Sequence, residues 1–331
     1  MDSKSLQLIL QAVNASEVAS IDTVQTLWSG YGKILRLRLL GGGMPSVIVK
    51  QISPPLDNAD HPRGWDTDVS HQRKLRSYQV EAAWYREWSG RCEAGCRVPQ
   101  CFLLDENSNG QLLVLEDLDA AGFPHRHHHL SDLGIRCCLN WLADFHATFL
   151  HERGDQPGWP AGLWEIGTYW HLATRPDEFA VMRAGPLKDS AAQIDRILRA
   201  ARFQTLVHGD AKVANFCFGQ GQAKVAAVDF QYVGGGCGMK DLAYFLGSCL
   251  SDAECESDHA RWLGVYFDAL AGSLQSRGAG FGFAAVEAEW RDLFAIAWAD
   301  FHRFMLGWCP GHAKLTGFSE SMVAKAVRVL G

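Results

Sequence analysis

Three polar residues in the second half of the chain have the types and the order that phosphoryl transfer requires. Asp210 follows His208 and Gly209, Asn215 comes five residues after Asp210, and Asp229 ends the next apolar run. Phosphoryl transfer depends mainly on positioning and charge neutralisation, so it needs a carboxylate that orients the acceptor and takes its proton. It also needs hard oxygen ligands for Mg²⁺. We assign the first role to Asp210 and the second to Asn215 and Asp229. A lone Asp there would indicate only a turn or a cap, but a turn does not require all three residues.

These residues lie around a predicted hairpin, whose two short apolar strands flank a turn at Gly219 to Gln222. Upstream, the predicted order is strands, one helix and strands, which indicates an antiparallel sheet in an α+β arrangement. After Ser131, a typical helix N-cap residue, the pattern becomes mainly helical. The sequence therefore predicts a sheet-rich lobe over residues 1–118 and a helical lobe over residues 119–331.

The individual elements follow from apolar periodicity and from turn residues. Helices are expected at residues 5–13, 71–89, from 131 onward and 286–305. Strands are expected at 47–52, near 102–104 and 112–115, and as a pair within 26–40 that turns at Gly30 and Gly32. A polar insertion loop is expected from Pro54 to about Ser70.

The motif His208-Gly209-Asp210 with Asn215, followed by Asp229-Phe230-Gln231, resembles the aminoglycoside phosphotransferase, choline kinase and ecdysteroid kinase-like families. The similarity extends over most of the chain. It implies the bilobal protein-kinase-like fold, with ATP and Mg²⁺ as cofactors. Asp241, in Asp-Leu-Ala, is similar to the family aspartate that braces the catalytic loop.

The resemblance also assigns the nucleotide site. Lys50 is similar to the lysine that binds the α- and β-phosphates, with Glu81 on the following helix as its ion-pair partner. Glu87 lies on the same predicted helix but on a different face, so only one of the two glutamates can meet Lys50. The run from Leu113 through Glu116 to Leu118 is similar to the hinge that holds adenine through backbone groups. The turn with Gly30 and Gly32 occupies the place of the phosphate-covering loop, although a Gly-x-Gly turn is also ordinary hairpin chemistry.

Two further residues of the catalytic loop have expected roles. Lys212 lies two residues after Asp210, where many serine/threonine protein kinases carry a lysine that offsets charge on the transferred phosphoryl group. A solvated loop lysine is the alternative for Lys212. His208 is expected to brace the loop by hydrogen bonds rather than to exchange protons with substrate.

The acceptor is expected to be a hydroxyl of a small molecule: sterol-like or ecdysteroid-like, an amino alcohol, or aminoglycoside-like. Only a short glycine-rich segment separates Asp229 from Asp241, and it contains no Ala-Pro-Glu. Peptide substrates usually need a longer platform at this place. The alternative function is that of a catalytically silent nucleotide-binding scaffold, but none of the catalytic Asp, Asn or Lys residues is missing.

Composition restricts the other classes of function. The 331 residues are 47% hydrophobic and 21% charged with a net charge of -6, so no basic field is available for nucleic acid. No apolar run reaches the roughly 18 residues of a membrane span, and the N-terminus lacks a secretory pattern, so we expect a cytoplasmic protein. The 10 cysteines are then expected to be reduced thiols. The sequence leaves the oligomeric state open.

Two groups of residues have more than one interpretation. His125 and His127 to His129 form a tract that could bind a transition metal, but a polar rim of the cleft is the favoured interpretation. On the helix at 286–305, one stripe is expected to face the core, namely Trp290, Leu293, Ala297, Phe301 and Met305. Trp298 lies at the margin of this stripe and could face a cleft, where aromatic walls suit cationic or flat apolar substrates.

Overall fold

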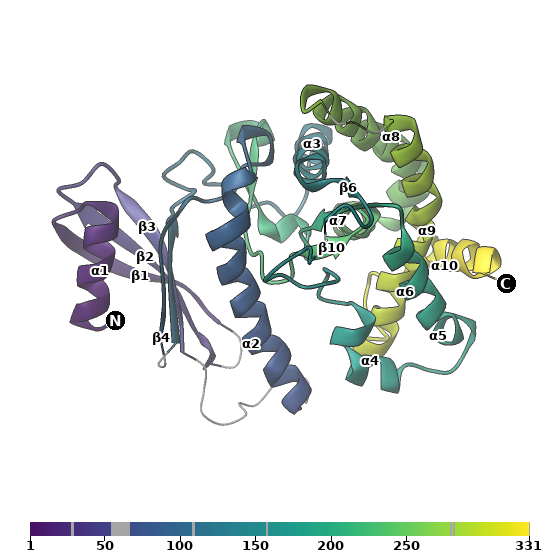
Figure 1. The fold of residues 1–331 in the computed structure, drawn as a ribbon, viewed down its shortest axis with the longest axis horizontal. Helices are drawn as coiled ribbons and strands as arrows, with labels where there is room; N and C mark the ends of the chain where they lie inside the picture. Colours follow the sequence, from purple (N-terminus) through teal and green to yellow (C-terminus); the bar gives the residue numbers. More distant parts are fainter. Residues whose placement is uncertain are drawn as a thin grey trace.

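The structure is a computed structural model that describes residues 1–27, 30–53, 67–107, 110–156, 158–278, 280 and 282–330. A strongly twisted sheet forms one end of the molecule, and helices form the other end (Figure 1). The predicted α+β class, with an antiparallel sheet followed by a mainly helical part, is confirmed. The predicted lobe boundary at residues 118 and 119 falls in the connection between the last strand of this sheet and the next helix.

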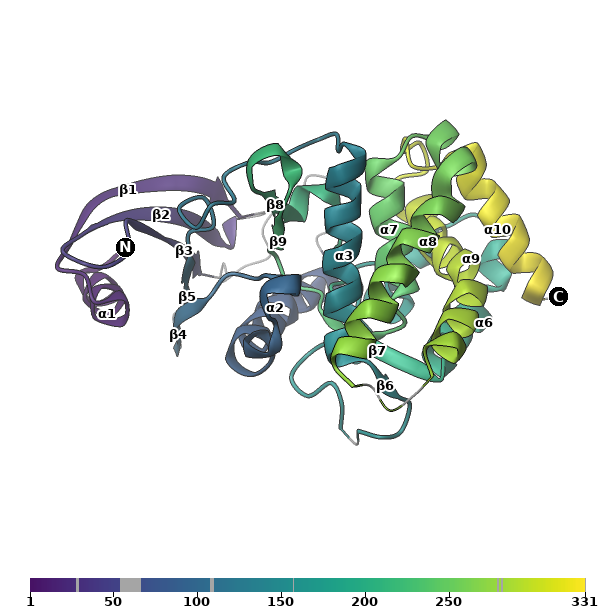
Figure 2. The same cartoon turned by 90° about the horizontal axis from the view of Figure 1, so that it is seen from above.

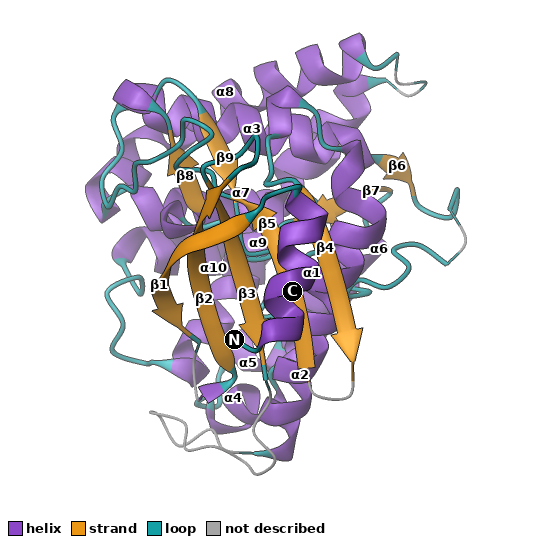
Figure 3. Cartoon of the chain, turned by 90° about the vertical axis from the view of Figure 1, so that its left-hand side faces the viewer, coloured by secondary structure: helices purple, strands orange, loops and turns teal. Residues whose placement is uncertain are grey.

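The sheet has five antiparallel strands in the order β1-β2-β3-β5-β4. They are β1 (Glu17–Thr26), β2 (Gly32–Leu40), β3 (Ser46–Ile52), β4 (Cys101–Asn107) and β5 (Gly110–Glu116). Helix α1 (Ser3–Val13) lies across one face of the sheet (Figure 3). Its buried residues Ile9 and Val13 pack against apolar side chains of β2, β3 and β5. The other face is turned toward the rest of the molecule, so residues on that face of β3 can reach a cleft.

The sequence located α1, β3, β4 and β5 correctly but misplaced the first strand. Two strands were expected between Thr26 and Leu40, whereas only β2 lies there and β1 ends at Thr26. The physical reason is that β1 is an edge strand: every residue except Val18 is exposed, so its sequence lacks the alternation of apolar and polar residues that marks a half-buried strand.

Helix α2 (Asp68–Ala83) crosses between the sheet and the helical part (Figure 1) and continues into a π-helical turn, η2 (Trp84–Trp88). The helix was expected at 71–89 and begins three residues earlier, after Thr67, whose hydroxyl accepts from Ser70 N–H at 3.1 Å. Most of the predicted insertion loop, residues 54–66, lies outside the described residues.

Helix α2 is bonded to the helical part along its length. Arg73 donates to the Thr174 carbonyl at 3.0 Å, and Arg76 donates to the Leu163 carbonyl at 3.0 Å. At its end, the Trp84 ring stacks on another aromatic ring of that part, Phe230, with centroids 4.5 Å apart and planes 13° apart. These contacts attach to the second half of the chain a helix that belongs by sequence to the first half.

The helical part is built around α3 (Asp132–Phe149), which packs beside α8 in the view from above (Figure 2). Ser131 caps α3 as predicted, because its hydroxyl accepts from Gly134 N–H at 3.2 Å. The remaining helices are α4 (Pro176–Val181), α5 (Pro186–Asp189), α6 (Ala191–Ala200), α7 (Met239–Cys249), α8 (Asp252–Ser276), α9 (Phe283–Trp308) and α10 (Gly317–Leu330).

Short strands in this part carry the motif residues toward the sheet. The predicted hairpin is present as β8 (Phe216–Phe218) and β9 (Val225–Ala227), which pair antiparallel. A second small sheet has the order β10-β7-β6, from β6 (His151–Glu152), β7 (Phe203–Val207) and β10 (Gly234–Gly236). All three residues of β8, β9 and β10 are buried, so the loops between them rest on a rigid base.

The stripe predicted on α9 is buried: Trp290 and Ala297 are fully enclosed, and Leu293 is nearly so. Trp298 does not face a cleft, which corrects the alternative considered from the sequence. It is 5% exposed, and its indole N–H donates to Ser319 Oγ on α10 at 3.0 Å, because α10 covers the margin of the stripe.

Two other features concern what the protein contacts. Among the described residues, no helix combines the length and apolarity needed to cross a bilayer. Within the same ranges no group of three or more His, Cys, Asp or Glu side chains is arranged to hold a metal ion. The backbone of His125 instead pairs with Phe218 through N–H to carbonyl bonds of 3.1 and 2.9 Å, which attaches the start of the histidine tract to β8.

Candidate active site

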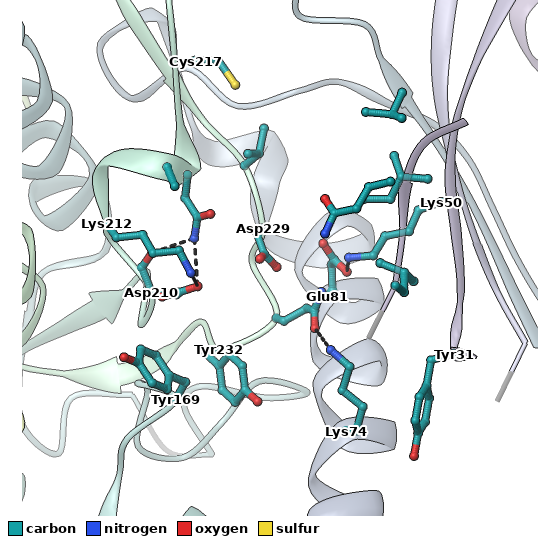
Figure 4. Close-up of a pocket in the computed structure, with 18 of the residues that line it drawn as sticks. Tyr31, Lys50, Lys74, Glu81, Tyr169, Asp210, Lys212, Cys217, Asp229 and Tyr232 are labelled. Atoms are coloured by element: carbon teal, nitrogen blue, oxygen red, sulfur yellow. Dashed lines mark hydrogen bonds and ion pairs between the residues drawn. The ribbon is translucent and has the colours of Figure 1, made fainter. Parts of the chain in front are cut away.

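A cleft of about 1040 Å³ lies where the sheet, α2 and the helical part meet. The structure brings eight of the residues predicted from sequence into its walls: Lys50, Glu81, Glu116, Leu118, Asp210, Lys212, Asn215 and Asp229. His208, Gly30 and Gly32 are not among the lining residues. In Figure 4, Asp210 and Lys212 face Lys50 and Glu81 across the cleft, with Asp229 between the two groups.

The loop that carries Asp210 is held by Asp241, the third residue of α7. Asp241 is fully buried, and its two carboxylate oxygens accept from His208 N–H at 2.5 Å and Gly209 N–H at 2.9 Å. Gly209 has a φ of 79°, and a β-carbon there would collide with the Tyr232 carbonyl oxygen. Only glycine fits this position, and the tight turn directs the next residue, Asp210, into the cleft.

Asp210 is 7% exposed, and its two oxygens differ in their surroundings. Oδ2 accepts from the Lys212 ammonium and from the Asn215 amide, each at 2.9 Å. Oδ1 is buried and has no hydrogen-bond partner among the described residues. Burial raises the pKa of Asp210 above its ordinary value, and Lys212 opposes this shift. One carboxylate oxygen is therefore fixed by the protein, and the other is available to a ligand.

His208 braces the loop, as predicted. Its ring donates from Nε2 to the Val228 carbonyl at 3.0 Å and accepts at Nδ1 from Asp210 N–H at 3.2 Å. Both ring nitrogens are used in the neutral form, and the ring is fully buried. No nitrogen of His208 is left to exchange a proton with a substrate.

Asp229 follows β9 and has a φ of 70°, a left-handed conformation that few non-glycine residues adopt. Its Oδ1 is buried without a partner in the described part of the chain. Burial favours protonation, but the ammonium groups of Lys50, Lys74 and Lys212 hold the pKa of Asp229 below its ordinary value. The carboxylate is therefore ionised and available as an oxygen ligand.

Lys50 and Glu81 form an ion pair with Nζ and Oε2 2.5 Å apart, and both side chains are buried. Glu87 lies on an exposed face of the π-helical turn and does not contribute to the cleft walls. Glu81, the glutamate named from the resemblance, is therefore the partner of Lys50. The pair connects β3 to α2 beside Asp229 (Figure 4).

Lys74 is a cleft residue that the sequence reasoning missed. Its side chain projects from α2 into the cleft (Figure 4). Its ammonium donates to the Gln231 side-chain oxygen at 3.0 Å and lies 4.7 Å from the centre of the Tyr78 ring. Burial lowers the pKa of Lys74 to about 8. The signal was present in the sequence, because Lys74 precedes Glu81 by seven residues and two helical turns place both on one face.

The predicted hinge lies at the end of β5. None of the hydrogen bonds formed between described residues uses the Leu118 N–H, which leaves it available to a ligand. The Glu116 side chain turns to Arg97, which donates at 2.6 Å, and Asp117 accepts from Ser46 Oγ at 2.6 Å. The cleft walls also contain the apolar side chains Ile34, Ile48, Leu115, Cys217 and Val228.

The turn between β1 and β2 has the backbone chemistry expected of its glycines. Gly30 and Gly32 have φ values of 75° and 143°, and the Gly32 carbonyl accepts from Leu27 N–H at 2.8 Å. Tyr31, between them, does line the cleft. A role of these glycines over phosphate groups stays a prediction.

Comparison with known proteins gives partial matches in sequence and full-length matches in fold. No curated protein sequence matches the chain. The family model of the ecdysteroid kinase-like family matches residues 186–278, which include Asp210, Asn215 and Asp229. A choline kinase from Cryptosporidium parvum Iowa II superposes with a TM-score of 0.53 at 10% identity, covering 99% of this chain and 95% of that one. The chain has a protein-kinase-like fold.

Two further structures agree with this assignment. A Plasmodium vivax ethanolamine kinase gives a TM-score of 0.51 at 11% identity, covering 93% of this chain and 82% of that chain. A GDP complex of aminoglycoside 2'-phosphotransferase-IIIa gives 0.50 at 12% identity, covering 99% of both chains. The predicted resemblance to these families is confirmed at the level of the fold.

The end of the kinase-like cleft away from the hinge has an aromatic wall that the sequence did not identify as a site. Tyr169, Tyr232 and Tyr244 line it, and Tyr169 donates to Tyr244 through their hydroxyls at 3.3 Å. Tyr169 and Tyr232 lie below Asp210 in Figure 4. Phe301 and Met305 of the α9 stripe are buried, as the sequence predicted, and they also border this wall. Most of these residues come from separate loops and helices, so no sequence period connects them.

Proposed function

We propose that the protein is a phosphotransferase that moves the γ-phosphoryl group of ATP to a hydroxyl of a small molecule. The observation that carries this proposal is the divided environment of Asp210, a residue that lines the cleft: Oδ2 is fixed by Lys212 and Asn215, and Oδ1 is buried and has no hydrogen-bond partner among the described residues. The partial family match and the kinase-like fold support it. The neighbouring structures that act on choline, ethanolamine and aminoglycosides support a small acceptor.

In this proposal Asp210 orients the acceptor hydroxyl and takes its proton. Oδ1 receives the O–H, the acceptor oxygen forms a bond to the γ-phosphorus, and the bond from that phosphorus to the bridging oxygen of ADP breaks. Asn215 and Lys212 keep Oδ2 in place, so the free oxygen keeps one direction. Lys212 is also suited to offset negative charge on the group in transfer.

The donor set fits Mg²⁺. Asp229 presents a buried carboxylate oxygen that has no partner among the described residues. The amide N–H of Asn215 donates to Asp210, so the side-chain oxygen of Asn215 is left as an acceptor. Asn215 and Asp229 would hold the ion, with nucleotide oxygens as further ligands. When bound, Mg²⁺ supplies charge neutralisation for the phosphates. Lys50, oriented by Glu81, and Lys74 are the cations placed to hold those phosphates.

The segment after Asp229 supports a small acceptor rather than a peptide. Its glycines form β10, which is buried and paired with β7 through residues 205–207. It therefore offers no exposed platform between Asp229 and α7. Sterol-like compounds, amino alcohols and aminoglycoside-like compounds are the acceptor classes proposed at this level.

The second candidate is a nucleotide-binding protein without catalysis, and one experiment separates the two. ADP formation is measured with MgATP for the wild type and Asp210→Asn, first without acceptor and then across hydroxyl compounds. Phosphotransfer predicts that Asp210→Asn loses about 10²–10⁴-fold in turnover while ATP binding changes only a few-fold. It also predicts that excess EDTA abolishes turnover. Equal turnover in the two proteins, or full activity in EDTA, would refute the proposal; binding of MgATP with no turnover on any acceptor would favour the scaffold.

A further inference from the structure

The carboxylates in the cleft walls are nearly all used by the protein itself. Glu81 pairs with Lys50, Glu116 with Arg97, and Asp117 with Arg36. Asp210 pairs with Lys212 and is the proposed base. Asp229 is the remaining lining carboxylate, and it is the proposed metal ligand. No carboxylate among the lining residues is therefore left to bind a positively charged acceptor.

The cations in the same walls show the opposite situation. Arg73, Lys74 and Lys314 line the cleft, and none of them forms an ion pair with a carboxylate in the part of the chain that the structure describes. Lys74 lies with Lys50 near Asp229, where nucleotide phosphates would use its charge. Arg73 is occupied by Thr174 and Ser70. Of these three cations, Lys314 is the one that lies against the aromatic wall at the end of the cleft away from the hinge.

Lys314 lies in the connection between α9 and α10, and its ammonium is placed against two aromatic faces. Nζ is 4.5 Å from the centre of the Tyr244 ring and 5.5 Å from that of Phe301. Burial lowers the pKa of Lys314 to about 8, although the Asp210 carboxylate favours its charged form. No ion pair joins the Lys314 ammonium to a carboxylate of the described residues.

These contacts decide what the aromatic wall can bind. Faces of aromatic rings attract cations, and an open box of them would suit an ammonium group of a ligand. Here the protein's own lysine already occupies the faces of Tyr244 and Phe301. A second cation would meet like charge, whereas an anionic group would supply the counter-ion that Lys314 lacks.

We propose that the acceptor is a small hydroxyl compound with a flat or apolar body and one singly charged anionic group, such as a carboxylate, which pairs with Lys314. This inference rests on the proposed function and narrows it: the amino alcohol and aminoglycoside classes are excluded as acceptors. A single unpaired ammonium matches a monoanion better than a doubly charged phosphate ester, which would keep uncompensated charge in a buried site.

The test uses three probes that share one hydroxymethylphenyl body and carry an anionic, a neutral or a cationic group: 4-(hydroxymethyl)benzoate, its primary amide and 4-(hydroxymethyl)benzylamine. Binding of each to the full chain is measured by calorimetry in the presence of Mg²⁺ and a non-hydrolysable ATP analogue, which fills the phosphate positions. We expect the benzoate to bind at least about 10-fold more tightly than the amide, the range of one charge-assisted hydrogen bond, and the benzylamine not to bind.

The variant Lys314→Met keeps an unbranched side chain against Tyr244 and Phe301 but removes the charge. It should reduce affinity for the benzoate about 10-fold and leave affinity for the amide unchanged. The control is Lys325→Met, at an exposed position of α10 outside the cleft walls, which should bind all three probes like the wild type. Binding of the ATP analogue to Lys314→Met shows that the variant is folded.

Each result has one meaning. Preference for the amide or the benzylamine, no binding of the benzoate, or equal binding of the benzoate to Lys314→Met would overturn the anionic acceptor. The proposed function fails separately, if the ATP analogue does not bind the wild type or if Asp210→Asn turns over ATP normally. Binding of the analogue without binding of the benzoate removes only the inference about the acceptor.

Discussion

Replacing Asp241 by Asn tests whether the catalytic loop depends on one buried carboxylate. The two oxygens of Asp241 accept from consecutive backbone N–H groups of His208 and Gly209 at 2.5 and 2.9 Å, and Oδ2 also lies 3.3 Å from His146 Nε2. Asn has nearly the same shape, but its NH₂ group cannot accept from an N–H. One of the two loop donors must then lose its partner and face another donor.

The expected loss follows from these bonds. A hydrogen bond to a charged group contributes about 1.5–3 kcal/mol, and the bond that remains to the neutral amide contributes only about 0.5–1.5 kcal/mol. We therefore expect Asp241→Asn to lower the free energy of unfolding by about 3 kcal/mol. Because Asp210 follows Gly209 directly, a displacement of the loop by about 1 Å should also reduce kcat on the order of 10²-fold.

The assay is urea unfolding of the pure protein together with kcat for ATP turnover. The matched control is Asp195→Asn, since Asp195 also accepts from a histidine, His171 at 2.9 Å, but forms no bond with the loop that carries Asp210. The control should lose less than about 1 kcal/mol and keep kcat. Unfolding within 0.5 kcal/mol of wild type and kcat within two-fold, each about the error of such assays, would refute the bracing role of Asp241.

Other predictions concern the two cleft lysines and two titrating groups. Lys50→Ala should weaken ATP binding and slow turnover. Lys212→Ala should instead lower kcat about 10²-fold with KM for ATP nearly unchanged. A raised KM for ATP with normal kcat in Lys212→Ala would contradict the role of Lys212 in offsetting charge on the transferred group. Burial raises the pKa of Asp210 and Lys212 opposes this shift, so kcat/KM should rise with pH through a pKa above 3.8. In Lys212→Ala this rise should occur at higher pH. Coincident pH profiles of the two proteins would contradict the assignment of the rise to Asp210. Burial also lowers the pKa of His302 from 6.5 to about 4, so its neutral form stabilises the fold above pH 6.5. That stability, up to about 3 kcal/mol, should be lost as pH falls from 6.5 to about 4, and His302→Gln should flatten the curve of unfolding free energy against pH.

The catalytic loop was readable from sequence because its geometry depends on near neighbours. Gly209, Asp210 and Asn215 are close in the chain, and the hairpin that follows sets the position of Asp229. Lys50 and Glu81 are further apart, but each lies on a regular element whose period fixes the side that it faces. The choice between Glu81 and Glu87 needed the structure, because the period excludes one glutamate without saying which.

The residues at the end of the cleft away from the hinge could not be predicted from the sequence in this way. Tyr169, Tyr232 and Lys314 are on irregular segments, and only the packing of α7, α9 and the loops brings them together. A partly buried lysine in a connection cannot be distinguished from a solvated one in the sequence. The same limit explains Trp298, whose environment is decided by α10, a helix that packs on α9 from the end of the chain.

Helix α2 is attached to both parts of the molecule. Arg73, Arg76 and the stack of Trp84 on Phe230 join α2 to the helical part. The ion pair of Lys50 with Glu81 and an apolar cluster that includes Leu27, Tyr31, Ile52 and Tyr78 join it to the sheet. A change in the position of the sheet relative to α2 would therefore alter the Lys50–Glu81 pair, so α2 couples the two walls of the cleft.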